Sequence, residues 1–293
     1  MPAPMADPSA DLAFRRVRLA RALLSDRAMP AAGARHPARV SFGLPALDEA
    51  LQGGLARGAL HEFHAIEGAD AAAAGGLMLA LARRAADARP IVLVRQDFLD
   101  GETGALHPAG LPELGLDPSR LVLVRARDVA SLLQAGVEAA RCPALGAVLL
   151  EFWGDHRAFD LTSSRRLALA AQEAALPILM MRAAAPATPS AATTRWQVRP
   201  GLSRALEARA PGPPCFRLRL LKHRQGLDLR EWCVEWNRDR AVFESRHAGA
   251  AAQNHLHDRP QSGGATLSRA VPALPADRNP AGERADSGLR RAG

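Results

Sequence analysis

The segment from Ala65 to Gly76 is where residue types and spacing come closest to a phosphate-binding loop. It reads AIEGADAAAAGG. Such a loop needs glycine amides that wrap the phosphates, a lysine for the β and γ oxygens, and a serine or threonine that holds Mg²⁺. The segment has glycines but neither of the other groups, and the only lysine of the chain is Lys222. The sequence therefore predicts a degenerate nucleotide site at Glu67, Gly68, Asp70, Gly75 and Gly76.

The remaining nucleophilic and metal-ligating side chains form no set with a recognisable chemistry. Cys142, Cys215 and Cys233 are odd in number and lack C-x-x-C spacing, which argues against a disulfide framework and a zinc site. His61 and His64 are three residues apart on a predicted strand, so they point to opposite faces. We expect no catalytic residues, no metal site and no bound cofactor.

Alternating strands and helices must position these residues. Short apolar runs predict buried strands over 91–94, 121–124, 147–152 and 177–181. Helical patterns lie between them, over 77–86, 129–141 and 161–175. Strands that are apolar on both faces favour a parallel sheet covered by helices on both sides. We expect an α/β fold with a mostly parallel central sheet flanked by helices.

The pattern changes to strands alone after residue 194. Residues 195–199, 216–222 and 229–236 read as strands, and 216–220 alternates apolar and basic side chains, so one face packs and the other is wet. Residues 223–226 then close a C-terminal β-hairpin.

The two ends of the chain differ from this core, which we place at residues 40–244. Residues 1–10 and 245–293 have a low-complexity composition that predicts disorder. Residues 11–28 predict an amphipathic helix, joined to the core by a Pro/Gly-containing linker over 29–39. This helix could dock on a partner or fold back on its own domain. Its candidate binding residues are Leu12, Arg15, Arg16, Leu19 and Leu23.

Composition limits which kinds of partner and which cellular compartment suit the protein. The chain has 293 residues and a formal charge of +8, which favours weak, salt-sensitive association with nucleic acid or an acidic partner. Arginine outnumbers lysine 37 to 1, a bias typical of a GC-rich genome, so it says little about function. Arginines interrupt the first apolar run, and no stretch is long enough to span a membrane. We expect a cytoplasmic protein without a membrane partner.

The stretch from Ser41 to Phe63 resembles the start of the RecA-type recombinase core. The shared pattern G-x-x-x-L-D-x-x-L-x-G-G-L-x-x-G runs from Gly43 to Gly58, and a strand with a glutamate near its end follows. The pattern also makes physical sense, because its leucines form one helical face and the paired glycines end that helix. The resemblance implies a RecA-like core.

The resemblance also shows two departures beyond the phosphate loop, at Glu151 and at Met181-Arg182. Glu151 ends the run from Ala147, where the family usually has an aspartate in the Mg²⁺ shell. Asp97 could correspond to the water-activating carboxylate, but without phosphate contacts it has nothing to act on. Met181 and Arg182 replace the expected polar sensor. Together these departures imply that the chain does not hydrolyse ATP and is not an enzyme.

The combination of a basic N-terminal helix, an eroded phosphate loop and a C-terminal hairpin is similar to the ImuA family (inducible mutagenesis protein A). The hairpin has the form Leu221-Lys222-His223-Arg224 followed by W-x-V-x-W at 232–236. The resemblance covers residues 11–243. It implies a non-catalytic, RecA-like accessory protein of the SOS response and translesion DNA synthesis. Its implied partners are RecA, the polymerase-like ImuB subunit and, indirectly, an error-prone polymerase. The cell-division inhibitor SulA is a more distant competitor.

Within this resemblance, Lys222 and Arg224 fall where the RecA core presents two basic residues across a protomer interface. They are therefore candidate partner-binding residues, although basic residues at a hairpin end can also simply be solvated. Loops 154–160 and 183–194 replace the DNA-binding loops of the recombinase. The second loop has no aromatic or charged residue, so DNA binding there is not expected.

Two alternative functions stay open. A divergent ATPase would bind nucleotide through Gly68, Gly75 and Gly76, using helix amides alone. A recombination mediator would be held on single-stranded DNA by net charge, and its binding would depend steeply on salt.

Overall fold

The structure is a computed structural model that describes residues 38–246, with gaps at 205, 208–209, 211 and 228–229. Within these residues, no helix combines the length and the apolar character needed to cross a membrane. Several predictions fall outside the described residues. They are the disordered start, the helix over 11–28 with Leu12, Arg15, Arg16, Leu19 and Leu23, the linker up to residue 37, and the tail from 247.

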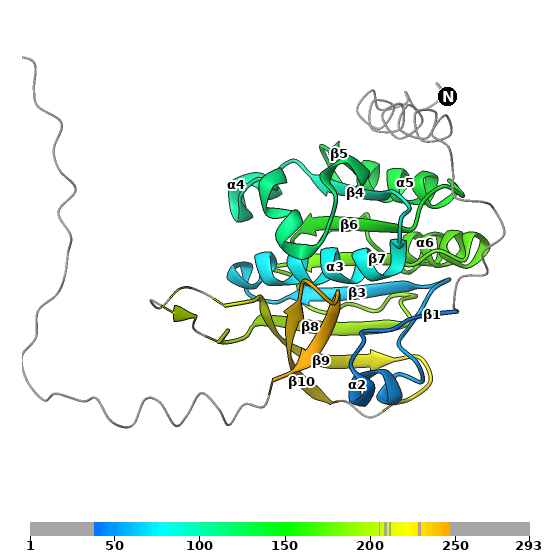
Figure 1. Cartoon of the computed structure of the whole chain (residues 1–293). Helices are drawn as coiled ribbons and strands as arrows, with labels where there is room; N and C mark the ends of the chain where they lie inside the picture. Colours follow the sequence, from blue (N-terminus) through cyan, green and yellow to red (C-terminus); the bar gives the residue numbers. More distant parts are fainter. Residues whose placement is uncertain (1–37, 205, 208–209, 211, 228–229, 247–293) are drawn as a thin grey trace, which may run out of the picture.

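A nine-stranded sheet organises the fold, in the order β11-β10-β9-β8-β3-β7-β6-β4-β5 (Figure 1). All pairs from β8 through β3 to β5 are parallel, and β9, β10 and β11 add antiparallel strands beyond β8. The parallel strands are β3 (Leu60–Ala65), β4 (Ile91–Gln96), β5 (Leu121–Ala126), β6 (Ala147–Trp153), β7 (Ile178–Ala183) and β8 (Thr194–Pro200). The antiparallel strands are β9 (Cys215–His223), β10 (Glu231–Asn237) and β11 (Val242–Ser245). The expected α/β fold and hairpin are confirmed, while β11 was not anticipated and includes Ser245, which the sequence assigned to the tail.

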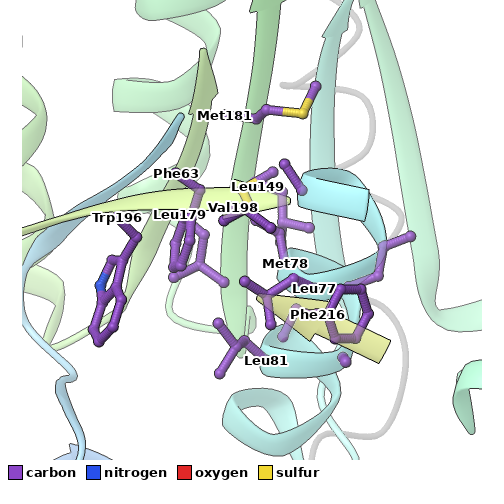
Figure 2. Close-up of a cluster of buried hydrophobic side chains, with 14 of the residues drawn as sticks. Phe63, Leu77, Met78, Leu81, Leu149, Leu179, Met181, Trp196, Val198 and Phe216 are labelled. Atoms are coloured by element: carbon purple, nitrogen blue, oxygen red, sulfur yellow. The ribbon is translucent and has the colours of Figure 1, made fainter. Parts of the chain in front are cut away.

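Helices cover both faces of the parallel strands. Helix α3 (Ala71–Ala86) packs on one face, and α5 (Val129–Ala140) and α6 (Leu161–Ala174) pack on the other. Figure 2 shows Leu77, Met78 and Leu81 of α3 against side chains of the sheet. The prediction began this helix at residue 77, but it begins at Ala71. Alanines carry no amphipathic signal, although alanine is the best helix former.

Side-chain caps fix where α5 and α6 begin. Asp128 accepts a hydrogen bond from the backbone N–H of Ser131 at 2.7 Å. Asp160 and Ser163 form a capping box, in which each side chain bonds the other residue's backbone N–H. Such caps satisfy N–H groups that have no partner within the helix. They set the ends of the loops that run from the carboxyl edge of the sheet into these helices.

The segment that resembles the start of the recombinase core contains one short helix and contributes to a two-stranded sheet, which is separate from the nine-stranded sheet. Strand β1 (Arg39–Val40) pairs with β2 (Leu55–Ala56), and α2 (Pro45–Ala50) lies between them in the chain. Residue 39, predicted as linker, therefore lies in a strand. Gly54 has a φ of +111°, and an added Cβ would lie 2.2 Å from the carbonyl oxygen of Val40. Any side chain at residue 54 would collide with the backbone of Val40, which explains why this residue is a glycine.

An irregular excursion connects β4 to β5 and was missed by the sequence analysis. It contains α4 (Leu99–Thr103) and the 3₁₀ turns η2 (Pro108–Gly110), η3 (Pro112–Leu114) and η4 (Pro118–Arg120). Its buried residues Leu99, Leu111 and Leu116 join the core cluster of α3. The excursion therefore lies next to the region where the degenerate nucleotide site was predicted.

Candidate functional site

The carboxyl edge of the parallel strands holds most of the predicted site. After β3 the chain passes Glu67, forms the 3₁₀ turn η1 (Gly68–Asp70) and enters α3 at Ala71. In a phosphate loop, the helix that follows this strand starts with lysine and then serine or threonine. Here it starts with Ala71 and Ala72. The N-terminal amides of α3 are therefore present, but the ammonium and hydroxyl groups that a nucleotide needs are not.

Acidic side chains replace the expected phosphate at the start of α3. Asp70 is buried, and burial together with the charge of Glu67 raises the pKa of its carboxyl group, while Arg199 opposes this rise. Arg199 of β8 contacts Glu67 Oε1 through Nη2 at 2.9 Å and Asp70 Oδ2 through Nε at 3.7 Å. A phosphate here would meet two carboxylates and would compete with them for Arg199. The local charge therefore disfavours an anionic ligand.

The predicted glycines serve packing rather than phosphate binding. A Cβ on Gly68 would lie 2.5 Å from the indole ring of Trp153, so the glycine lets this ring lie against the loop. Gly75 and Gly76 lie in the second turn of α3 and not in the loop, which corrects their grouping with it. A Cβ on Gly75 would lie 3.1 Å from Glu151 Oε1, and one on Gly76 would lie 3.8 Å from the Phe216 ring.

Glu151 lies in a buried ion pair. Its side chain is 2% exposed and accepts a hydrogen bond from Arg95 Nη1 at 3.0 Å. Burial raises the pKa of Glu151, and the charge of Arg95 offsets only part of this rise. Arg95 also contacts Asp100 Oδ1 at 3.1 Å and donates to the carbonyl oxygen of Gly104 at 2.8 Å. The carboxylate that could have bound Mg²⁺ is thus already matched by a cation of the protein.

A cavity of about 270 Å³ remains beside this ion pair. It lies between α3 and the β4–β5 excursion, and its walls are mostly apolar. Ala72, Gly75, Leu106, Leu111, Arg95 and Glu151 are among the residues that line it. Arg95, Glu151 and Thr103 are already engaged with groups of the protein, so His107 is the main polar side chain left in the lining to orient a ligand.

A second polar cluster lies on the opposite face of the sheet, at β3, β7 and β8. Glu62 Oε2 accepts from Arg195 Nε at 2.8 Å and contacts His64 Nε2 at 3.2 Å. Burial alone would raise the pKa of Glu62, but hydrogen bonds from His64 and Ser190 and the charge of Arg195 hold it below its usual value. Arg195 also donates to Ser190 Oγ at 2.9 Å, which anchors the loop over 183–194.

Arg182 ties this loop to its neighbour. Its Nη1 donates to Thr188 Oγ1 at 2.7 Å and its Nη2 contacts Asp155 Oδ1 at 3.1 Å. The guanidinium carbon also lies 4.9 Å from the centre of the Phe159 ring. Arg182, which stands where the sequence resemblance implies a polar sensor, therefore holds together the two loops over 154–160 and 183–194.

The two predicted partner-binding residues of the hairpin differ in exposure. Lys222 is half-buried and its Nζ donates to the carbonyl oxygen of Ser190 at 3.1 Å. Burial lowers the pKa of Lys222, as does the charge of Arg195. Arg224 is exposed, and its backbone N–H bonds the carbonyl oxygen of Thr193 at 2.9 Å. Lys222 thus supports the loop, and Arg224 is the more accessible of the two.

The structure brings together two cysteines that the sequence analysis treated as isolated. The sulfur atoms of Cys215 and Cys233 lie 3.7 Å apart on neighbouring strands β9 and β10. Burial, together with Cys233, raises the pKa of the Cys215 thiol to about 12. The predicted turn over 223–226 was the signal that could have found them, because both cysteines lie at similar distances from its centre.

Comparison of the chain with protein-family models and with curated proteins finds no match in either case.

Proposed function

We propose that the chain is a non-catalytic, RecA-like accessory protein that acts as a scaffold in damage-induced mutagenesis. In this proposal it binds RecA and a polymerase-like partner, and through them serves an error-prone polymerase. The pairing of Glu151 with Arg95 at the carboxyl edge is the observation that carries the non-catalytic part. The partners come from the resemblance to the ImuA family.

The energies involved support a site without nucleotide. Breaking a buried ion pair by removing one partner costs about 3–5 kcal/mol. Micromolar affinity corresponds to about 8 kcal/mol of binding free energy. A Mg²⁺–nucleotide complex that drew Glu151 away from Arg95 would therefore lose about half of this binding free energy, which is about a thousandfold in affinity. It would also lack the lysine and hydroxyl contacts, because α3 begins with alanines.

A divergent ATPase is the alternative that a specific observation favours. The N-terminal amides of α3 and the cavity of about 270 Å³ lie where a nucleotide would be expected. Asp70 and Glu67 weaken this alternative, since they put negative charge at the same place. Only the overall charge of +8 supports the other alternative, a recombination mediator that is held on single-stranded DNA by its net charge.

Two measurements on the purified full-length chain test the proposal. Titration calorimetry with Mg²⁺–ATP should give no binding heat, and a variant with Asp70→Gly, Ala71→Lys and Ala72→Thr should gain little, because Arg95 still holds Glu151. A pull-down against RecA and the polymerase-like subunit of the same organism should capture both, with or without ATP. A truncation to residues 29–293 tests whether the N-terminal segment contributes to capture.

Micromolar ATP affinity of the unaltered chain, together with no capture of either partner, would overturn the proposal in favour of the divergent ATPase. Capture of both partners without ATP affinity is the result that we expect.

A further inference from the structure

One face of β8, β9 and β10 is not covered by any described helix. Helices α5 and α6 cover the same side of the sheet only over the parallel strands, and β8–β10 extend beyond them (Figure 1). We call this surface the open face. Most of the side chains that point to it are polar or charged, among them Gln197, Arg199, Arg217, Arg219, Glu231, Cys233 and Glu235. Cys215 lies on the same side of β9 but is buried.

The cations of the open face form a row along β9. Arg217 and Arg219 are exposed, while the alternate residues Phe216, Leu218 and Leu220 are at most 3% exposed on the other side. Within the described part of the chain, neither arginine has an ion-pair or hydrogen-bond partner for its side chain. Two residues of a strand span about 6.7 Å, which sets the spacing of the two guanidinium groups. The row therefore presents positive charge at a regular repeat.

The strand next to the row adds to this positive charge instead of neutralising it. Arg199 of β8 lies directly opposite Arg217 in the antiparallel register. Like charges directly opposite each other destabilise a sheet. Arg199 is partly engaged by Glu67, but Arg217 has no such partner among the described residues. A carboxylate from outside would remove this repulsion.

On the other side, β10 borders the row with carboxylates. Glu231 lies opposite Arg219 in the register, and Glu235 accepts a hydrogen bond from Arg246 at 2.6 Å. The positive row is thus about one strand wide and has a negative border. A polyanion wider than the row would be repelled by this border, whereas a single extended segment with neutral side chains between its carboxylates can keep its charge over the row.

The charges of this chain's own terminal segments do not suit the row. Residues 1–37 contain six arginines and three aspartates, a net charge of +3. Residues 247–293 contain six arginines and four acidic residues, a net charge of +2. Charge therefore favours an occupant from another molecule.

We propose that the open face binds an extended acidic segment of a partner protein, with carboxylates placed over Arg217 and Arg219. In an extended segment every second side chain points the same way, with the same repeat of about 6.7 Å. Guanidinium groups and carboxylates form paired, charge-assisted hydrogen bonds. The inference rests on the proposed scaffold function and names the chemistry of one partner. Single-stranded nucleic acid suits the face less well, because no aromatic side chain among the described residues points to it for base stacking.

The test uses the full-length chain and a short fluorescent peptide of alternating Glu and Thr. Anisotropy at low salt should show binding that weakens as salt rises. The double variant Arg217→Glu/Arg219→Glu should weaken it by at least about tenfold, since two charge-assisted contacts are lost. The matched control Arg165→Glu/Arg166→Glu makes the same charge change at exposed positions of α6 and should stay within about twofold. Both variants should stay close to the thermal midpoint of the unaltered chain, because all four arginines are exposed. In the first variant, the like charge placed opposite Glu231 is offset by the opposite charge placed across from Arg199.

A second readout does not depend on charge. Cys233 lies opposite Arg217 on the open face and is only partly buried, so bound peptide should slow its alkylation. Unchanged alkylation under saturating peptide would contradict the proposed place of binding.

Other outcomes would overturn the inference in distinguishable ways. Equal weakening by both double variants would mean that only net charge attracts the peptide. Tighter binding of an oligodeoxythymidylate, lost in the Arg217→Glu/Arg219→Glu variant, would assign the face to nucleic acid. Capture of RecA and the polymerase-like subunit at wild-type levels by this variant would leave the scaffold function standing and reject the open face as its dock. Conversely, specific peptide binding without capture of either protein would reject the scaffold function. It would still support the inference that the open face binds an acidic segment.

Discussion

The carboxyl edge of the parallel strands and the open face of β8–β10 treat charged side chains in opposite ways. At the edge, Arg95 is buried and meets Glu151, Asp100 and backbone carbonyls within the same chain. On the open face, Arg217 and Arg219 point to solvent, and no described residue pairs with their side chains. The first arrangement stabilises the fold and resists ligands. The second contributes little to the fold and leaves charge available to another molecule.

The largest expected effect comes from breaking the ion pair at the edge. Arg95→Leu should lower the free energy of unfolding by about 3–5 kcal/mol at neutral pH, because it leaves Glu151 charged and buried. Burial already raises the pKa of Glu151, so the folded state holds its proton to higher pH than the unfolded state. The energetic penalty of burying the charged Glu151 side chain therefore grows as pH rises and shrinks as pH falls. The free energy of unfolding that Arg95→Leu loses should accordingly be smaller in acid than at neutral pH. Urea denaturation at two pH values measures this.

Two companion variants separate the ion pair from a general effect of removing arginine. Arg125→Leu removes an arginine that is 30% exposed and also pairs with Asp100, and it should cost no more than about 1 kcal/mol. Arg95→Leu/Glu151→Leu should recover most of the stability, since no unpaired charge remains buried. A loss in the double variant as large as in Arg95→Leu would show that the charge of Glu151 is not the cause.

An intermediate effect on stability is expected from His61, which lies where β3 pairs with β8, between the two regions. His61 Nε2 lies 2.8 Å from the carbonyl oxygen of Ala56, which can only accept, so Nε2 carries the proton and Nδ1 accepts from Thr194 Oγ1. Burial lowers the pKa of His61 to about 4 from 6.5. Above pH 6.5 both states are neutral, and as pH falls toward 4 only the unfolded state gains the proton. Stability of up to about 3 kcal/mol should be lost over this window.

His61→Gln removes this titration and should flatten the fall in stability between pH 6.5 and 4. Denaturation of both proteins at matched pH values gives the comparison. If stability fell with pH to the same extent in both proteins, His61 would not be the cause of the pH dependence.

The smallest effect is expected on the open face. Arg217→Gln should leave stability unchanged or raise it by a few tenths of a kcal/mol, because it removes a like charge opposite Arg199. Thermal denaturation at low salt shows this best, since salt screens the repulsion. A loss above about 1 kcal/mol would mean that Arg217 supports the fold, and the contrast with Arg95 would disappear.

The sequence predicted those parts of the fold whose signal is local. The alternation through Leu218 and Arg219 predicted the wet face of β9, and the apolar runs predicted the buried strands. The start of α3 was missed because a run of alanines and glycines has no hydrophobic face to detect. The β4–β5 excursion was missed because its short turns carry no periodicity.

The candidate site shows the same limit more sharply. The missing lysine was visible in the sequence, but the pairing of Arg95 with Glu151 joins residues that are 56 positions apart. Only the parallel register of β4 and β6, which places these two residues side by side, reveals it. Likewise, Gly75 looked like part of a loop, while its role is to leave room for Glu151.

Strand β5 has a consequence for how the protein behaves at high concentration. It is the last described strand at its end of the sheet, its sequence begins Leu-Val-Leu-Val, and Leu123 is 38% exposed. An open, apolar edge strand is a template for adding a strand from another chain, which is how sheets begin to aggregate. Arg120 precedes this run, and Arg125 and Arg127 follow it, in the flanking positions where charge blocks such addition. We therefore expect these arginines to limit aggregation of the protein at high concentration.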